Sequence, residues 1–444
     1  MKHAYCRRPA VWLVAAAVLA VPFSGLGAAD GAVPDARLEL LEQQNRDLQE
    51  QLRRQQEMIS SLSNAVAEIR KSEVSVAPGP AAPGPSQAGE MASSGLHFGK
   101  LRFSGEGAVA FFDSQSEGAY PNGTFRADEF RLFVDAQVLE DVYVFAELDL
   151  TTREESGFSA QAGEIYLDAE NLSKLWGQDG QLNLRVGQFY IPFGEEYQER
   201  YAIDDPLITH SISDLWGVDE GVELYGAVGR MSYVVAVQNG GVPVTQDLTQ
   251  DKSVSGRIGY DPAKWLHLSV SGMRTGDLSA QGDVLSAMWF GNGWFRSLGS
   301  SNATTFHCDL VEGDVQFKFP HTAIKAFGGW IYYDDNDPAA DNHRNVYYYC
   351  VEGVQDLIGP FYAATRFSQS FGKGGFPIVG NAPRSEYLFG PLTDNLWCWS
   401  FGLGYRWDHH LVVKVEYAVE QGSEAGGERR TQENLFATQA AFAF

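Results

Sequence analysis

Side chains between Leu96 and the last residue, Phe444, alternate between apolar and polar with a period of two. Along residues 130–138 one face is apolar and carries Phe130, Leu132, Val134, Ala136 and Val138. The opposite face of this segment carries Arg131, Asp135 and Gln137. Because successive side chains of a β-strand point to opposite faces, this period predicts strands. A soluble β-sandwich alternates in the same way, so the pattern alone leaves a sandwich and a membrane barrel open.

Three further features favour a barrel that crosses a membrane with strands. After Asp30 no stretch approaches about 18 consecutive apolar residues, which excludes transmembrane helices but not transmembrane strands. Aromatic residues cluster near segment ends: Trp265, Trp330, Tyr332, Tyr347, Tyr348, Trp397, Trp399 and Trp407. The final segment alternates up to a terminal phenylalanine, which is typical of bacterial outer-membrane barrels. About sixteen strand candidates follow Leu96, and they predict an all-β antiparallel barrel over 96–444.

The first residues have the pattern of a secretory signal peptide. Lys2, Arg7 and Arg8 precede an apolar run from Ala10 to Phe23, and small residues at 27–29 offer a cleavage site. The apolar run is too short for a transmembrane helix, which needs about 20 residues. We therefore predict that 1–29 is removed on export.

A heptad pattern follows over residues 36–71. Its apolar seam repeats with spacings of three and four: Leu38, Leu41, Asn45, Leu48, Leu52, Gln55, Ile59, Leu62, Val66 and Ile69. Asn45 and Gln55 are polar residues in this seam, and such residues fix register and strand number. The pattern predicts a coiled coil that oligomerises. Residues 72–95 are rich in Pro, Gly, Ala and Ser and predict a linker.

Composition and charge exclude several classes of protein. The chain is 44% hydrophobic and 13% aromatic, too apolar for a disordered polyelectrolyte. Its formal net charge is -24, and nearly all of this acidity lies after the linker. Nucleic-acid binding needs clustered Lys and Arg, so we expect no nucleic-acid partner.

The sequence predicts neither an enzyme nor a metal or cofactor site. It has no GxSxG motif, and its histidines fall in no recognisable catalytic pattern. Cys308, Cys350 and Cys398 remain after export without CxxC spacing, so metal binding is not expected, while one disulfide among them stays open.

Several segments resemble the phosphate-selective porin O/P family of outer-membrane porins. They occur in family order: LRVGQFYIPFGEE (184–196), VDEGVELYGAVG (218–229), VAVQNG (235–240), SGRIGYDP (255–262), YCVEGVQDL (349–357), YAATRFS (362–368) and FGLGYRWDHHLVVKVEY (401–417). The resemblance implies a homotrimer of sixteen-stranded barrels in the bacterial outer membrane, in contact with its lipid. It implies a water-filled channel for passive diffusion of ions and small hydrophilic solutes, and a periplasmic place for the coiled coil.

The lysines depart from this family. Family members that select phosphate line the pore with lysine ladders, whereas the lysines here are scattered: Lys100, Lys174, Lys252, Lys264, Lys318, Lys325, Lys373 and Lys414. We therefore expect a channel that is not specific for phosphate and that weakly prefers cations.

Selectivity is expected in the long connection between Phe189 and Gly221, which exceeds the usual connection of about 2–6 residues. The resemblance implies that this third external loop folds into the lumen. It carries the expected constriction residues Glu195, Glu196, Glu199, Arg200, Asp204, Asp205, Asp214 and Asp219. Alternation places six arginines on the lumen face as a basic wall opposite the loop: Arg102, Arg131, Arg185, Arg257, Arg366 and Arg406. Such an arrangement would produce a transverse field; the alternative is that these charges only solvate a wide lumen.

A structural role is the alternative to a channel. The coiled coil would then tether the outer membrane to the cell wall, with the barrel as its anchor. No dedicated cell-wall-binding domain precedes the coil, and both roles are compatible.

Overall fold

The computed structural model of the chain describes residues 96–98, 100–152, 160–240, 247, 249–280, 302–376, 392–408 and 410–444. The expected signal peptide (1–29), coiled coil (36–71) with its seam, and linker (72–95) lie outside these residues and stay predictions. Within the described ranges no helix has the length and apolarity needed to span a membrane.

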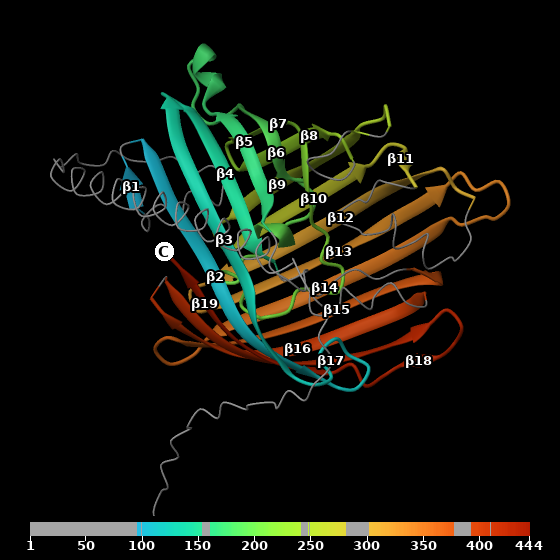
Figure 1. The fold of residues 1–444 in the computed structure, drawn as a ribbon. Helices are drawn as coiled ribbons and strands as arrows, with labels where there is room; N and C mark the ends of the chain where they lie inside the picture. The colour runs from blue at the N-terminus through green and yellow to red at the C-terminus, as the bar shows by residue number, and fades with distance from the viewer. Residues whose placement is uncertain are drawn as a thin grey trace, which may run out of the picture. The chain divides into compact units, whose positions relative to one another are not determined.

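Strands make up about 67% of the described residues, and the other regular elements in these ranges are two short 3-10 helices (Figure 1). In chain order the elements are β1 (Leu96–Phe98), β2 (Leu101–Ser114), β3 (Thr124–Leu139), β4 (Val142–Thr151), β5 (Gln161–Ala169), η3 (Leu172–Trp176), β6 (Asn183–Tyr190), η4 (Glu196–Glu199), β7 (Val218–Val228), β8 (Met231–Gln238), β9 (Ser253–Ala263), β10 (Leu266–Arg274), β11 (Leu278–Ser279), β12 (Thr305–Phe319), β13 (Thr322–Asp335), β14 (Arg344–Asp356), β15 (Phe361–Phe376), β16 (Thr393–Trp407), β17 (Leu411–Glu424), β18 (Arg429–Arg430) and β19 (Leu435–Ala443).

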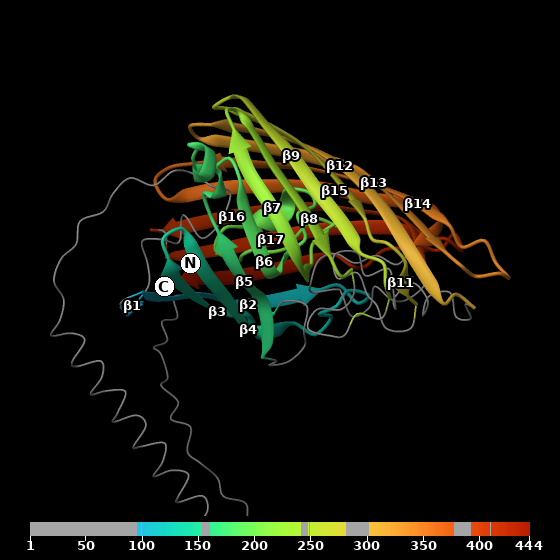
Figure 2. The same ribbon diagram turned by 90° about the horizontal axis from the view of Figure 1, so that it is seen from above.

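The strands form one closed antiparallel barrel (Figures 1 and 2). Each long strand pairs with the next, and β19 closes the sheet by pairing with β2 from Leu435↔Ser114 to Ala443↔Glu106. Apart from the short strands β1, β11 and β18, the described residues contribute sixteen long strands to this barrel. The predicted all-β barrel of about sixteen strands is confirmed.

The two ends of the barrel differ in their connections. One end, the turn end, has short turns at 140–141, 229–230, 264–265 and 320–321, and it also holds the start of β2 and the C-terminus. The turn between β7 and β8 begins with Gly229 at φ +65°, a left-handed conformation that favours glycine. The other end, the loop end, has longer connections such as 115–123, 191–217 and 336–343.

Alternation separates an outer from an inner face on each strand. Outward side chains are apolar and exposed, as Val235, Ile258, Val270 and Leu403 illustrate. Exposed apolar side chains over a closed sheet match a surface that lies in lipid. Near the turn end the inner face is charged or polar, as at Glu106 of β2. This half of the barrel has the polar interior that the sequence predicts.

The inner face changes character toward the loop end, where it is apolar and fully buried. Phe306 and Leu310 of β12, Tyr333 of β13 and Leu396 of β16 are each at most 1% exposed, and they belong to one hydrophobic cluster. Phe112 of β2 and residues of the 191–217 connection complete this cluster. We call this hydrophobic cluster the apolar zone. Its position inside the barrel differs from the polar lumen that the sequence predicts. At the loop end of β12 the apolar side chains face the interior, and the polar Thr305, His307 and Asp309 take the outward positions.

Candidate functional site

The connection between β6 and β7, residues 191–217, lies inside the barrel, and we call it the inner loop. It is the third connection at the loop end, as the sequence predicts. Most of its side chains and backbone groups are buried, including Ile208, Thr209 and Ser211 at 0% exposure. Burying so much backbone requires partners for its N–H and C=O groups. Partners for this backbone come from the inner faces of β10, β15 and β17.

Lys414 of β17 holds the first half of the inner loop. Its ammonium is 2% exposed and donates to three loop carbonyls, those of Ala202 (2.8 Å), Asp205 (3.1 Å) and Leu207 (2.8 Å). A lysine ammonium has three donors, and here each meets one buried carbonyl.

Glu416, two residues further along the same face of β17, holds the next part of the loop. Its Oε2 accepts from the backbone N–H of Ile208 (2.5 Å) and of Thr209 (2.9 Å). The Ser368 hydroxyl of β15 accepts from the Ile212 N–H at 3.1 Å. Together with Lys414, these side chains satisfy donors and acceptors of the loop, so β17 and β15 fix its path.

A tight turn at Gly194 begins the loop. Gly194 has φ +70°, and a Cβ at this position would collide with the Glu312 carboxylate of β12. Its N–H donates to Ser271 of β10 at 3.0 Å, and its carbonyl accepts from Arg257 of β9. Glycine is therefore favoured by the backbone conformation, and a side chain at this position would also displace the end of the Glu312 side chain.

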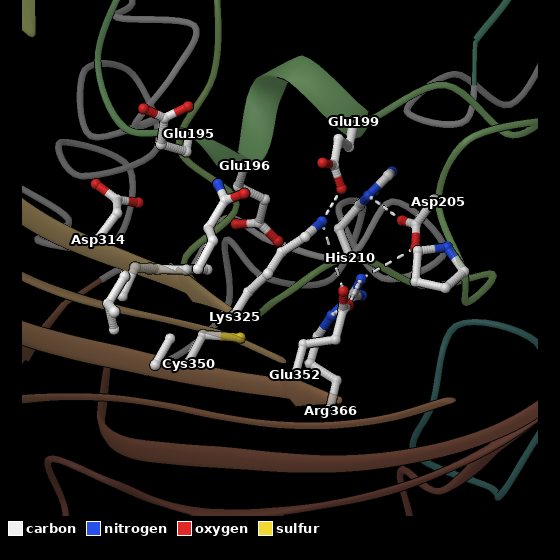
Figure 3. Close-up of a pocket in the computed structure, with 15 residues that line it drawn as sticks. Glu195, Glu196, Glu199, Asp205, His210, Asp314, Lys325, Cys350, Glu352 and Arg366 are labelled. Carbon is white, nitrogen blue, oxygen red and sulfur yellow. Dashed lines mark hydrogen bonds and ion pairs between the residues drawn. The ribbon is translucent and has the colours of Figure 1, made fainter. Parts of the chain in front are cut away.

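Four of the predicted loop acids gather around a cavity between the inner loop and strands β12–β15 (Figure 3). The cavity measures about 40 Å³, room for about three water molecules. Its polar lining consists of Glu195, Glu196, Glu199, Asp205, His210, Asp314, Gln316, Lys325, Cys350, Glu352 and Arg366. Six carboxylates thus face two permanent cations and one histidine.

Ion pairs fill one side of this cavity. Arg366 of β15 donates to Glu352 at 2.7 Å and pairs with Asp205 of the loop at 3.0 Å. His210 lies 3.0 Å from the other oxygen of Asp205, and Lys325 pairs with Glu199. Figure 3 shows Glu195 and Asp314 at the other end of the lining. There Glu195 pairs with Arg257 of β9 at 3.1 Å, and Asp314 accepts from the Ser269 hydroxyl at 3.0 Å. Carboxylates at both ends of the cavity therefore have partners on the wall.

The neighbouring carboxyls Glu195 and Glu196 have opposite pKa shifts. Burial raises the pKa of Glu196, and the charge of Arg366 and the hydrogen bonds from Ser211 only partly oppose this. Burial also acts to raise the pKa of Glu195, but the hydrogen bond with His267 and the charge of Arg257 outweigh it, so this pKa is lowered. Glu195 therefore keeps its charge to lower pH than Glu196 does.

The remaining predicted loop residues lie elsewhere. Arg200 pairs with Asp214, and its guanidinium stacks over Trp216 at 4.1 Å. Asp204 is exposed. Asp219 is wrongly predicted as a loop residue: it belongs to β7, where its carboxylate accepts from the backbone N–H groups of Glu220 and Gly240.

The predicted basic wall is wrong as one surface, although alternation places the arginines on the inner face. They are spread around the barrel: Arg102 on β2, Arg131 on β3, Arg185 on β6, Arg257 on β9, Arg366 on β15 and Arg406 on β16. Most pair with wall carboxylates, as Arg131 does with Glu106 (3.2 Å) and Arg185 with Asp168 (2.9 Å). Arg257 and Arg366 bind loop carboxylates directly. The arginines therefore neutralise acids locally and do not face an acidic loop across a gap.

The three described cysteines are free and buried. Cys350 of β14 and Cys398 of β16 are both in register with Ser368 of the intervening strand β15. Two strand spacings separate them by about 9.5 Å, more than the Cα separation of about 7 Å that a disulfide tolerates.

Sequence reasoning missed the residues that position the loop, above all Lys414, Glu416 and Lys325. The available signal is the alternation in Val412–Val415, which places Lys414 between outward-facing apolar residues. The sequence does not show which distant backbone groups such a buried charge satisfies.

Comparison with known proteins supports the fold. No family model and no curated protein matches the chain. Among solved structures it is similar to the outer-membrane channel DcaP of Acinetobacter baumannii, with 13% identity, a TM-score of 0.53 and coverage of 78% of this chain and 97% of that one. It is similar to OprB of Pseudomonas putida, with 10% identity, a TM-score of 0.51 and coverage of 80% and 96%. A trimer form of OmpT, an outer-membrane protein of Vibrio cholerae, gives 10% identity, a TM-score of 0.51 and coverage of 78% and 99%. The chain has the fold of these outer-membrane proteins.

Proposed function

We propose that the chain is an outer-membrane porin, a channel for the passive diffusion of small solutes whose aperture is set by the inner loop. The observation that carries this proposal is a closed barrel, apolar outside, with a long loop held inside it by buried side chains of the wall. A barrel that only anchored the chain would not need a loop fixed across its interior. The porin fold supports a non-enzymatic role and a homotrimer.

We further propose that the channel weakly prefers cations and is not specific for phosphate. The excess of acids at the cavity supports the cation preference: six carboxylates line it, against Lys325, Arg366 and the Arg257 guanidinium that pairs with Glu195. The basic residues of the cavity support the absence of phosphate specificity. Lys325 and Arg366 are both paired with carboxylates, so neither offers an uncompensated positive charge to a phosphate.

Recordings in planar bilayers test both proposals. The purified protein should form channels, and its reversal potential across a KCl gradient should have the sign of cation preference. A clear anion preference would refute the cation proposal, and block of the KCl current by inorganic phosphate would refute the phosphate proposal. Absence of any channel would refute the porin proposal.

The tether remains the second candidate for residues 36–71, which lie outside the described residues. A chain lacking residues 38–69 separates the roles. Loss of envelope integrity with unchanged conductance would indicate a tether, whereas loss of trimers would indicate an assembly device.

A further inference from the structure

The outer face of the barrel is hollowed where β13–β17 and β19 approach the turn end, in the orange to red part of Figure 1. The hollow is a groove of about 640 Å³. Its floor consists of small residues on neighbouring strands, Gly353 of β14 and Ala363 and Thr365 of β15, and Gly353 is in register with Thr365. A strand surface that carries such small side chains lies lower than its surroundings.

Large apolar side chains stand on both sides of this floor. Ile324 of β13 is 39% exposed and pairs with Gly353 on one side. Phe401 and Leu403 of β16, 47% and 55% exposed, pair with the two β15 floor residues on the other side. The outer side chains of β17 and β19 continue this wall. The groove is therefore open to the surroundings and offers exposed apolar surface to a ligand.

The polar side chains of the floor and of its turn-end edge already have hydrogen-bond partners within the protein. The Thr365 hydroxyl donates to the Ser400 carbonyl (3.0 Å) and accepts from the Trp399 indole N–H (2.9 Å). At the turn-end edge the Thr322 hydroxyl donates to Gln355 at 2.7 Å, and the Gln355 amide donates to two backbone carbonyls at 2.9 Å. An occupant therefore gains apolar contact from the groove, whereas a sugar or a hydrated ion would lose hydrogen bonds to water there without replacing them.

Aromatic residues at the turn end locate the groove relative to the membrane surface. Phe361 at the start of β15 and Trp407 at the end of β16 are 51% and 66% exposed, and Tyr405 packs edge-on against Phe361 at 4.9 Å. Aromatic rings of this kind form the belts at which a membrane meets water. The groove begins on the apolar side of these rings, where the acyl chains of the leaflet at the turn end begin.

We propose that the groove binds one acyl chain of a phospholipid from this leaflet, with the headgroup at the aromatic edge. The chain is apolar, flexible and narrow, so it can follow the floor and contact both walls at once. An occupant restores the dispersion contacts that the floor lacks while the groove is empty. A second copy of the barrel would approach with a convex outer face, which leaves a recess unfilled. The site does not depend on what crosses the channel, so it goes beyond the proposed porin function.

Retention of phospholipid by the full-length protein tests the proposal. The protein is reconstituted in vesicles of phosphatidylethanolamine and phosphatidylglycerol, extracted, and washed in dodecyl maltoside until bulk phospholipid is removed. Lipid extraction and mass spectrometry then give the phospholipid per protomer, and we expect the wild type to retain one. Gly353→Leu builds a side chain on the floor, where a Cβ meets nothing within 4 Å, and should lower this occupancy at least about tenfold. Ala363→Leu fills the same floor from β15 and should act alike, which keeps the test decisive if Gly353→Leu fails to fold.

Gly313→Leu is the matched control, because Gly313 of β12 is also exposed on the outer face, has room for a Cβ, and lies outside the groove. This variant should retain phospholipid as the wild type does. A wild type without retained phospholipid, or equal occupancy in the wild type and Gly353→Leu, would overturn the proposal. Loss of oligomers in Gly353→Leu alone, with no phospholipid on the wild type, would also overturn it, because a second copy would then cover the groove. Channel formation in planar bilayers should be the same in the wild type and all three variants, so failure of the groove leaves the porin proposal intact.

Discussion

Replacing Lys414 by methionine should release the inner loop from the wall. Methionine keeps an apolar stem but removes the three donors that meet the carbonyls of Ala202, Asp205 and Leu207. Three hydrogen bonds from a charged donor, at about 1.5–3 kcal/mol each, set an upper limit of about 4.5–9 kcal/mol. The ammonium itself was desolvated in the folded protein, and such terms are not additive, so we expect a net loss of about 3 kcal/mol in loop docking. Since 1.36 kcal/mol corresponds to a factor of ten, the undocked population should rise about 100-fold.

Amide hydrogen exchange measures this population directly. The Ile208 and Thr209 amides donate to Glu416 while the loop is docked, so their exchange reports opening of the loop. We expect their protection to fall about 100-fold and the single-channel conductance to rise. Lys100→Met is the matched control, because the exposed Lys100 ammonium makes one hydrogen bond, to the Val138 carbonyl at 3.3 Å. Protection within about threefold of the wild type would refute the assignment of Lys414 as the anchor.

Three further predictions follow from the site. Cation preference should decrease as the pH is lowered from neutral, because Glu196 has a raised pKa and takes up a proton before Glu195 does. Glu196→Gln should reduce this decrease, and Glu195→Gln should lower the preference at neutral pH as well, as reversal potentials would show. Gly194→Ala should destabilise loop docking by about 1–2 kcal/mol, as measured by amide exchange. Gly353→Ala is the control and should have little effect, because a Cβ there meets nothing within 4 Å. Equal effects of the two substitutions would contradict the argument from the backbone conformation of Gly194. A membrane-impermeant thiol reagent should label none of Cys308, Cys350 and Cys398 in the native barrel and all three after unfolding, as the mass of the protein would show. Labelling before unfolding would contradict their burial.

The strands and their faces are predictable from the sequence because both depend on local alternation. Arg131 and Glu147 point inward as their positions in the pattern require, and both are buried in the structure. The length of the 191–217 connection marks it as a functional candidate, because so long a connection is uncommon, whereas its place inside the barrel was implied only by the resemblance to porins. Sequence reasoning also placed Glu195, Glu196, Glu199 and Asp205 together, and they line one cavity.

Neighbours around the barrel are not predictable from alternation, and this explains the errors. Alternation assigns Arg185 of β6 and Arg366 of β15 to the inner face but does not show that eight strands, β7 to β14, lie between them along the chain. The hydrogen bond from Lys414 to Leu207 joins residues 207 positions apart, and no local pattern encodes such a contact. The apolar zone was missed because alternation shows that two faces differ but not which of them points inward: at the loop end of β12 the apolar Phe306 and Leu310 face the interior and the polar His307 faces outward.

The inner loop is held both by polar anchors and by apolar packing, and two variants separate these contributions. The Ile208 side chain packs in the apolar zone, while its N–H is held by Glu416 on the charged part of the wall. Lys414→Met removes polar contacts alone, so the conductance should rise and the amide protection of the loop should fall. Leu310→Asn places an amide at a wall position that is 1% exposed and lies in the same hydrophobic cluster as Ile208, so it should weaken docking through lost packing and an unsatisfied amide. A Leu310→Asn variant with wild-type protection would show that the polar anchors alone hold the loop, whereas equal losses in the two variants would show that apolar packing holds it as much as they do.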